Sequence, residues 1–234
     1  MRILLILLTV IVTLLAAGAA AADRIMPEPR ALDGVTAGAV ADGRLACIYG
    51  NLTSATSYEG WWGGNESYAR LISPQTEPCD CDIGFTIRSV NIMLGLDASA
   101  DLQVLSRLLE ADWNGSCWQP GATLAFSPVH TVDDIEIFGV HRVTIPCDFP
   151  CASMDEPYFI TVDFVGGTAD RVNIVGGGDA DPCASYNDWG DGWYDLVADI
   201  GFFDGLTMWA ESECCYQPIG NTASSWGRVK SLYR

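Results

Sequence analysis

Nine cysteines constrain the fold of this chain more than any other feature of its sequence. They stand at Cys47, Cys79, Cys81, Cys117, Cys147, Cys151, Cys183, Cys214 and Cys215. The Cα separation that a disulfide needs disfavours a bond within Cys79-Asp-Cys81 or within the vicinal Cys214-Cys215. We therefore expect each of these four residues to pair with a distant cysteine, unless one of them is left free. The chain must then bring remote segments together.

The spacing of the cysteines favours a disulfide framework over a zinc site, because no paired C-x-x-C spacing is present. Cys147 and Cys151 could close a small loop around Pro150. The odd number of cysteines leaves at least one thiol unpaired or bonded to another chain. The sequence does not determine which cysteines pair.

The N-terminus has the layout of a secretory signal peptide over residues 1–22. Arg2 precedes a run of thirteen apolar or threonine residues, Ile3 to Leu15, and a small-residue stretch then ends at Ala22. An uncleaved N-terminal anchor is the alternative. No later apolar run reaches about 18 residues, so we expect the mature chain to contain no membrane span. Export to the cell surface or the medium follows, and it suits a disulfide framework.

The rest of the chain divides into three parts. Residues 23–43 read as a loosely ordered leader, residues 44–216 as one domain of short β-like runs between turn clusters, and residues 217–234 as a tail. Eight to ten short strands with frequent turn signals predict an all-β, antiparallel β-sandwich or jelly-roll-like domain. The tail, which ends in WGRVKSLYR, is either a short basic recognition helix or a terminal turn that packs on the sandwich.

Three segments carry more detail. In 85–94 the apolar alternation shifts by one residue, which indicates a bulge near Arg88 and Ser89. Segment 101–113 fits a helix face or a strand, and the strands around it favour a strand. In 205–214, alternate side chains are expected to face inward and outward, with Leu206, Met208 and Ala210 on one face.

The charge of the chain disfavours two classes of partner. Its formal net charge is −18 at pH 7. Such a field repels phosphate backbones and anionic lipid surfaces, so we expect no nucleic-acid partner. A glycan or a protein remains open as a partner, and the oligomeric state is undetermined.

Four stretches together resemble a recurrent module. They are CDCDIGFTIRSVNIML, PYFITVDFVGG, CASYNDWGDGWYDL and MWAESECC. Their order is similar to that in secreted, uncharacterised proteins of environmental bacteria, where a YNDWGxGWYDL loop precedes a double cysteine. The resemblance covers roughly residues 45–216 and implies a secreted bacterial β-rich domain. It implies no activity and no catalytic residues.

The loop around YNDWGDGWYDLV concentrates oxygen ligands of the kind that calcium prefers. The candidate ligands are Asp179, Asp181, Asn187, Asp188 and Asp191, although their order does not match an EF-hand loop. Asp and Asn also favour turns through their own local hydrogen bonds. Both a calcium site and a plain turn rich in these residues are therefore open.

The same loop carries aromatic side chains that could stack on sugar rings. The candidates for binding are Tyr186, Trp189, Trp193 and Tyr194, and Trp61 with Trp62 forms a second aromatic pair. The alternative is that these rings cover the end of the sandwich. A solvent-facing strip at Trp189 and Trp193 would favour sugar binding, whereas buried rings would favour a scaffold.

Hydrolysis is the third possibility. Glu211 and Glu213, or Asp133, Asp134 and Glu136, supply carboxylates, but the chain shows no zinc-protease spacing and no G-x-S-x-G elbow. The sequence therefore predicts a secreted or cell-surface, non-catalytic binding or structural module with no firm cofactor. The alternatives are a calcium-supported carbohydrate-binding module and an extracellular hydrolase of unrecognised type.

Overall fold

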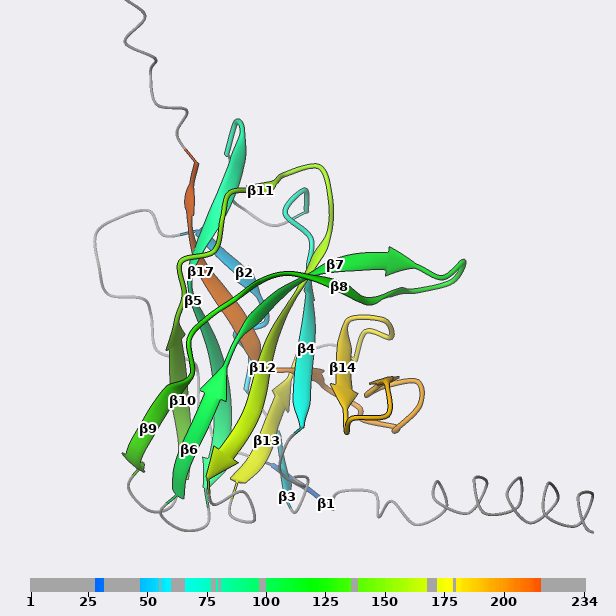
Figure 1. Cartoon of the computed structure of the whole chain (residues 1–234). Coiled ribbons are helices and arrows are strands. Elements are labelled where there is room, and N and C mark those ends of the chain that lie inside the picture. The colour runs from blue at the N-terminus through cyan, green and yellow to red at the C-terminus, as the bar shows by residue number, and fades with distance from the viewer. Residues whose placement is uncertain are drawn as a thin grey trace, which may run out of the picture.

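A computed structural model gives the arrangement of the chain. It describes residues 28–31, 47–54, 56–59, 66–76, 79, 81–96, 100–135, 139–167, 172–178 and 180–215. All the regular elements in these ranges are strands, and they form two antiparallel sheets. Figure 1 shows the sheets as two layers, with one hairpin extending away from them. The predicted all-β sandwich is confirmed for this part of the chain, and the predicted signal helix lies outside it.

The larger sheet has nine strands, and the order of its main path is β1-β3-β13-β5-β17-β2. Strand β10 and the short β11 pair with β5, and the short β16 pairs with β13. The bounds are β1 Glu28–Ala31, β2 Cys47–Gly50, β3 Thr56–Glu59, β5 Gly84–Leu96, β10 Gly139–Pro146, β11 Ala152–Ser153, β13 Val172–Gly177, β16 Gly205–Leu206 and β17 Met208–Cys214. Strand β1 comes from the segment that reads as a leader.

The smaller sheet has eight strands, and the order of its main path is β15-β14-β4-β12-β6-β9. Strand β7 pairs with β12 and β8, and the β7–β8 hairpin is the one that extends to the right in Figure 1. The bounds are β4 Ser67–Ile72, β6 Ala100–Leu105, β7 Arg107–Trp113, β8 Trp118–Phe126, β9 His130–Ile135, β12 Tyr158–Gly167, β14 Ser185–Asp188 and β15 Trp193–Asp195.

Two local predictions are confirmed. In the β5–β17 pair, Glu211 lies opposite Ser89 and Ser212 lies opposite Ile87, so Arg88 is the extra residue of a bulge. Segment 101–113 is extended rather than helical, but it divides at Ser106 into β6 and β7. At this break the backbone N–H of Ser106 donates to Ser127 Oγ at 2.9 Å, which keeps the buried polar group paired.

The main core fills the space between the sheets. It contains large inward-facing side chains from both layers, such as Phe85 and Leu94 of β5 and Ile160 and Val162 of β12. A period of two along the strands places these residues on the inner faces.

The outer side of β17 is buried as well, which corrects the expected alternation of buried and exposed residues. Leu206, Met208 and Ala210 belong to the main core as expected. Trp209, however, is 0% exposed and packs in a separate cluster with Met93 and Val175. The larger sheet therefore carries apolar packing on both faces at this strand.

Three disulfides join segments that are remote in the sequence. They are Cys81–Cys214, Cys117–Cys183 and Cys151–Cys215. The suggested Cys147–Cys151 loop is wrong, because Cys151 is bonded to Cys215. Cys47, Cys79 and Cys147 carry free thiols. Bonds of this kind are compatible with an oxidising compartment.

The Cys151–Cys215 bond lies beside Gly84 at the start of β5. Strand β11, which follows Cys151, pairs with Phe85, and Cys214 of β17 also pairs with Phe85. A Cβ atom on Gly84 would lie 2.9 Å from Cys151 Sγ and still closer to the backbone oxygen of Ala152. A residue without a side chain is therefore needed where the bond crosses the strand.

Among the described residues there is no helix of the length and hydropathy that crossing a membrane requires. The tail 217–234 and the pair Trp61 and Trp62 lie outside the described residues.

Replacing Gly84 by alanine should destabilise the fold. The new methyl group meets backbone and a disulfide sulfur, neither of which can move freely, so we expect a loss of about 1–3 kcal/mol in the free energy of unfolding. Gly121→Ala is the matched control, because a Cβ there meets only the end of the Asp112 side chain. Urea unfolding of the oxidised variants measures the difference. Equal stability of the two variants would contradict the crowding at Gly84.

The ionisation of Tyr58 makes the stability of the fold decrease as the pH rises through the alkaline range. Its ring is 1% exposed and stacks on Phe202 with centroids 3.9 Å apart. Its hydroxyl donates to Asp204 Oδ2 at 3.4 Å. Burial raises the pKa of Tyr58, and the negative charge of Asp204 raises it further. The folded state therefore binds the phenolic proton more tightly than the unfolded state does.

Since the folded pKa is the higher one, the stabilisation is present below the ordinary tyrosine pKa of about 10 and is lost as the pH rises above it. We expect the free energy of unfolding of Tyr58→Phe to fall less steeply than that of the parent chain between about pH 9 and pH 11. Asp204→Asn should keep most of the slope, because burial is the larger cause. Identical slopes for Tyr58→Phe and the parent chain would contradict the assignment. Denaturant titrations across this pH range provide the measurement.

Candidate functional site

The loop between β14 and β15 is a turn that its own aspartate stabilises. Asp188 Oδ1 accepts hydrogen bonds from the backbone N–H groups of Gly190, at 2.6 Å, and Gly192, at 3.1 Å. Both glycines have positive φ, 94° and 127°, which residues with a side chain adopt rarely. The carboxylate of Asp188 therefore acts first on its own loop.

The other residues predicted for calcium lie in different surroundings. Asn187 is buried, and its Nδ2 donates to the backbone oxygen of Ser67 at 3.2 Å, while its Oδ1 has no hydrogen-bond partner in the structure. Asp191 is exposed and accepts from the hydroxyl of Tyr194 at 3.4 Å. Asp181 is exposed as well, and Asp179 lies outside the described residues.

Two groups of three potential ligand side chains approach within 4.8 Å of one another in the described part of the chain. They are Cys47 with Cys81 and Cys214, and Cys117 with Cys183 and Asp195. Neither group contains a residue predicted for calcium. A calcium site at the 179–191 loop stays a prediction.

The four aromatic candidates divide between two sides of the smaller sheet. Trp189 is half-buried against the main core, and its ring centroid lies 5.1 Å from that of Tyr194. Tyr186 is 1% exposed, and its hydroxyl donates to the backbone oxygen of Trp118 at 2.8 Å. Trp193 is half-buried and packs beside Tyr186. The four rings therefore do not form one solvent-facing strip.

The outer face of the smaller sheet carries a small apolar cluster of its own. Ala69, Leu109, Phe159 and Tyr186 form its buried part, which we call the outer-face cluster. Two half-buried tryptophans, Trp118 and Trp193, pack against it. Paired register places Tyr186 opposite Ala69, and Phe159 opposite Leu109, so these side chains share one face. Aromatic side chains from remote segments thus meet on a single surface.

An ion pair lies beside Trp193 on this surface. Arg107 Nε and Nη2 donate to the two oxygens of Asp163 at 2.6 and 2.7 Å, and Arg107 Nη2 also donates to Ser67 Oγ at 3.3 Å. The guanidinium carbon lies 5.9 Å from the centroid of the Trp193 ring. Burial alone lowers the pKa of Arg107, but the hydrogen bonds and charge of Asp163 more than offset this, and the pKa is raised. The Arg107–Asp163 ion pair thus places a cation beside the Trp193 ring.

A pocket of about 340 Å³ lies beside Trp118. Its walls come from the turn after β4, the start of β8 and the bend before β12. The lining residues are Ser73, Pro74, Gln75, Thr76, Trp118, Asp155, Glu156 and Pro157. An indole, an amide, hydroxyls and two carboxylates therefore meet in one concave site.

Local bonds hold the walls of this pocket in place. Gln75 Nε2 donates to the backbone oxygen of Asp155 at 2.7 Å, which joins two of the walls. The hydroxyl of Thr76 donates to the backbone oxygen of Ser73 at 3.1 Å and closes the turn after β4. The Cys117–Cys183 disulfide stands directly before Trp118 and ties it to the segment that leads into β14.

Asp195 supports this disulfide, although little in the sequence singles it out. It is 5% exposed and accepts three backbone hydrogen bonds, from Cys183 at 2.5 Å, Val197 at 2.8 Å and Ala198 at 3.0 Å. It therefore acts as a structural residue that fixes the chain on both sides of the β14–β15 hairpin. Asp195 lies twelve residues after Cys183 in a turn-rich segment, and this position is the feature of the sequence that could have indicated its structural role.

Sequence reasoning also missed Trp118 and the pocket. Trp118 directly follows Cys117. A disulfide at Cys117 holds the neighbouring aromatic residue in place, and this adjacency could have indicated Trp118 as a candidate for binding. Gln75, Asp155 and Glu156 carry no motif, because the turn and the bend that supply them are ordinary in sequence.

Two of the carboxylates considered for hydrolysis, Glu211 and Glu213, have structural partners. Glu211 Oε2 accepts from Ser89 Oγ at 3.2 Å, and Glu211 Oε1 lies 3.8 Å from Arg142. Glu213 Oε2 lies 3.3 Å from Arg88 Nε. Both glutamates stand on β17 of the larger sheet, whereas the pocket lies at the smaller one. Of the other group, the backbone of Asp133 and Asp134 belongs to β9, and Glu136 lies outside the described residues.

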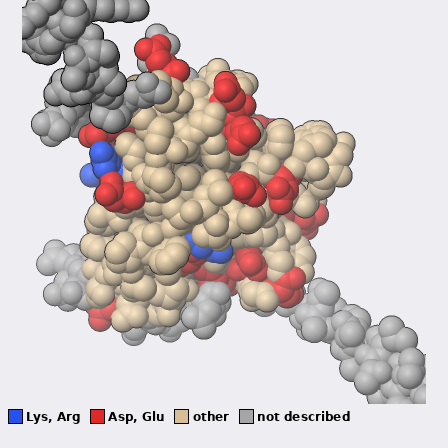
Figure 2. Space-filling view, turned by 45° about the horizontal axis from the view of Figure 1, so that its top comes forward, with Lys and Arg blue, Asp and Glu red and all other residues tan. Residues whose placement is uncertain are grey.

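The surface carries the acidity that the composition indicates. Figure 2 shows acidic side chains spread over the visible face, with few basic ones among them. An acidic surface of this kind repels polyanions, so we still expect nucleic acids to be disfavoured as partners.

The solved structures that are similar to this chain include two of the protein Cwp84. One contains the cysteine protease and lectin-like domains of Cwp84, a surface layer associated protein of Clostridium difficile, with 13% identity, a TM-score of 0.44 and coverage of 73% of this chain. The other is a clostridial Cwp84 cysteine protease after propeptide cleavage, with 14% identity, a TM-score of 0.39 and coverage of 68%. This chain spans 36% and 39% of their respective lengths.

No curated protein matches the chain. A family model does match: residues 46–212 fit the family described as a domain of unknown function, DUF7451. This confirms the expectation of an uncharacterised domain over the β-rich part of the sequence. The chain belongs to the DUF7451 family.

Proposed function

We propose that this protein is an exported, non-catalytic binding module whose ligand site is the pocket beside Trp118, and that the ligand is a neutral saccharide. The observation that carries the proposal is the composition of the pocket. An indole stands with amide, hydroxyl and carboxylate groups in a cavity of about 340 Å³. A cavity of this size lies within the usual range for small-ligand sites.

The chemistry of the pocket fits a sugar ring. The flat face of an indole covers the C–H face of a pyranose, as aromatic side chains do when they bury apolar surface. Gln75, Asp155 and Glu156 stand around it and supply acceptors and a donor for ring hydroxyls. A polar ligand gains orientation from a few such groups in a partly apolar site.

The charge of the site favours neutral over acidic saccharides. Two carboxylates line the pocket and no lysine or arginine does. The whole chain adds a net charge of −18. An anionic sugar would be repelled by the carboxylates of the pocket and by the net charge of the whole chain. Uronic acids and sulfated polymers are therefore disfavoured as ligands.

Two features support a binding role rather than hydrolysis. First, Asp155 and Glu156 are consecutive residues of one bend and both are exposed. Glycoside cleavage uses a pair of carboxyl groups that flank the scissile bond at a defined separation of about 5 to 9.5 Å. Second, the bonds that fix Gln75, Thr76 and Trp118 preorganise the walls, which lowers the ordering cost of binding.

Calcium support of this binding is the second form of the proposal. Asn187 belongs to the predicted calcium set, and its strand, β14, also carries Tyr186, which holds the backbone of Trp118. An ion at the 179–191 loop would therefore act on the pocket through β14. The binding experiment separates the two forms through its calcium and EDTA arms.

Removal of the indole should abolish most of the binding. Trp118→Ala removes the stacking face, and burial of an aromatic side chain contributes about 1.5–3 kcal/mol, so the affinity should fall roughly tenfold or more. The measurement is affinity electrophoresis in gels with soluble neutral polysaccharides, followed by calorimetry with oligosaccharides of the retained polymer. Calcium is added in one series and EDTA in another.

Phe126→Ala is the matched control, because Phe126 is 73% exposed on the same β7–β8 hairpin and does not line the pocket. It should leave the retention unchanged. Glu156→Gln tests the charge argument and should weaken the discrimination against acidic polymers. Retention of no polysaccharide by the parent chain, or equal retention by Trp118→Ala, would contradict the saccharide proposal. Release of reducing sugar would contradict the non-catalytic part.

A further inference from the structure

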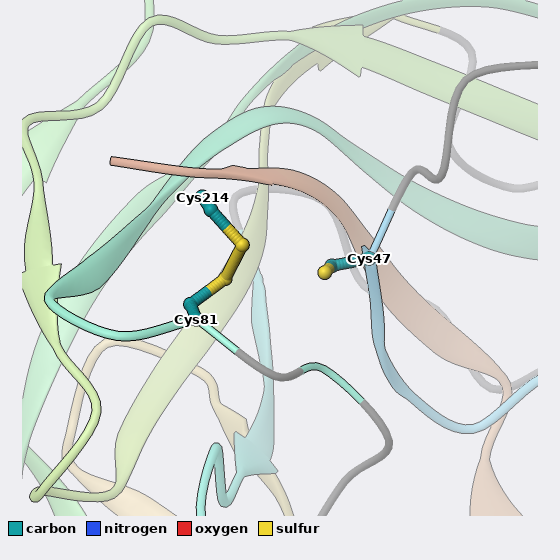
Figure 3. A group of neighbouring side chains, drawn as sticks. All are labelled: Cys47, Cys81 and Cys214. Atoms are coloured by element: carbon teal, nitrogen blue, oxygen red, sulfur yellow. A yellow bond between two sulfur atoms is a disulfide. The ribbon is translucent and has the colours of Figure 1, made fainter. Parts of the chain in front are cut away.

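Three sulfur atoms from three parts of the chain meet at one end of the larger sheet. The Sγ atoms of Cys47, Cys81 and Cys214 all lie within 4.8 Å of one another. In Figure 3 the Cys47 sulfur points toward the disulfide that joins Cys81 and Cys214. The free thiol of Cys47 is therefore held beside an existing bond.

The register of the sheet accounts for this meeting. Cys47 of β2 lies opposite Ser212 of β17, and directly opposed residues of an antiparallel pair share one face. Cys214 follows Ser212 by two residues and therefore points to the same face. Cys47 and Cys214 are thus diagonal neighbours, and Cys81 reaches them from the segment before β5.

A fourth cysteine adjoins this group. Cys79 precedes Cys81 by two residues, and it is 9% exposed and packs in the main core. Its side chain is hydrogen-bonded to that of Cys47. Both residues carry free thiols in the structure. The half-buried thiol of Cys47 and the buried thiol of Cys79, which interact with each other beside a disulfide, form a dithiol and are not isolated cysteines.

We propose that Cys47 and Cys79 are a second disulfide site in this cluster, so that the mature protein has four disulfides and Cys147 is its single free thiol. The proposal concerns the cysteine framework and does not depend on the saccharide proposal. It places two bonds side by side, Cys47–Cys79 and Cys81–Cys214, at the same end of the larger sheet.

The oxidation is a two-electron step. The thiols of Cys47 and Cys79 lose two protons, and a bond forms between their Sγ atoms. The two electrons pass to a disulfide oxidant of the export compartment, through a mixed disulfide, and that oxidant is released as two thiols. Burial raises the pKa of the Cys47 thiol to about 12, with a further contribution from its hydrogen bond with Cys79. Because the attacking species is the thiolate, the bond forms before this region is fully packed.

Two other uses of the cluster are less well supported. A metal site with four cysteine ligands would need all four sulfurs as thiolates, but Cys81 and Cys214 are already bonded to each other. Exchange of Cys47 into the Cys81–Cys214 bond needs the Cys47 thiolate, which burial disfavours. A stable pair of bonds therefore fits the surroundings better than a metal site or a switch.

The bond would fasten an edge of the larger sheet. Strand β2 ends the main path of the sheet, and β17 is its neighbour there. A bond from Cys47 to Cys79 joins β2 to the segment that enters β5, so the edge no longer depends on backbone hydrogen bonds alone. Fastened edges resist fraying and pairing with other chains.

Cys147 is the residue that the proposal leaves over. Its Sγ lies 3.2 Å from the backbone oxygen of Ile145, to which it donates. Burial raises the pKa of its thiol to about 12, so it is poorly ionised and unreactive. The buried position of Cys147 thus disfavours thiol–disulfide exchange by the one cysteine that has no partner in this proposal.

Counting of thiols in the exported, full-length protein tests the proposal. The protein is denatured without reductant, and thiols are titrated with a chromogenic disulfide reagent. We expect one thiol per chain, from Cys147, whereas three would react if Cys47 and Cys79 were both free. Cys147→Ser should lower the count to zero.

The variant Cys47→Ser gives the sharper comparison, because the two cases move in opposite directions. If the bond exists, its loss releases Cys79 and the count rises from one to two. If no bond exists, the count falls from three to two. Non-reducing peptide mapping of the parent protein provides a readout that does not depend on how the variants fold.

Several results would overturn the proposal. They are three thiols in the parent protein, a peptide pair that joins Cys47 to Cys81 or to Cys214, a bond between two chains, or one equivalent of zinc released by acid. A single peptide pair that joins Cys47 to Cys79 supports it.

Discussion

The vicinal cysteines at the end of β17 are the constraint on which the larger sheet depends. Successive side chains of a strand point to opposite faces, so adjacent cysteines in an extended segment reach in different directions. Cys214 bonds to Cys81 before β5, and Cys215 bonds to Cys151 before β11. Since β11 and β17 both pair with β5 at Phe85, one short stretch of the chain is fixed to the central strand from two sides. The bulge at Arg88 and the bare backbone of Gly84 are local adjustments to this arrangement.

The strands were largely predictable because their signals are local. A shift of apolar alternation in 85–94 located the bulge at Arg88, and the extended form of 101–113 followed from the strands expected around it. The cysteine pairing was not predictable, because it depends on which strands become neighbours in the sheet. The burial of Trp209 was missed for a related reason: alternation shows that two faces differ, but not that the second face is also covered.

The candidate site shows the same division between local and remote information. Composition drew attention to 186–197, where Asp188 closes its own turn and Tyr186 is buried beneath the surface. The pocket beside Trp118 instead draws its walls from three segments that are far apart in the sequence. A loop rich in aspartate and tryptophan can therefore be a support for a neighbouring surface. No pattern of spacing distinguishes these two uses, because the difference lies in the partners of each side chain.

The covalent framework also changes what a cut in the backbone would do. The Cys81–Cys214 bond joins residues that are 133 positions apart in the sequence. The Cys117–Cys183 bond lies within this span, and the Cys151–Cys215 bond begins inside it and ends just beyond it. Exposed loop tips are where proteases cleave folded domains. A single cleavage between Cys81 and Cys214 would leave both fragments joined, with their strands still paired in the two sheets. Such a molecule can be nicked and yet remain one particle, so digestion would be visible only after reduction.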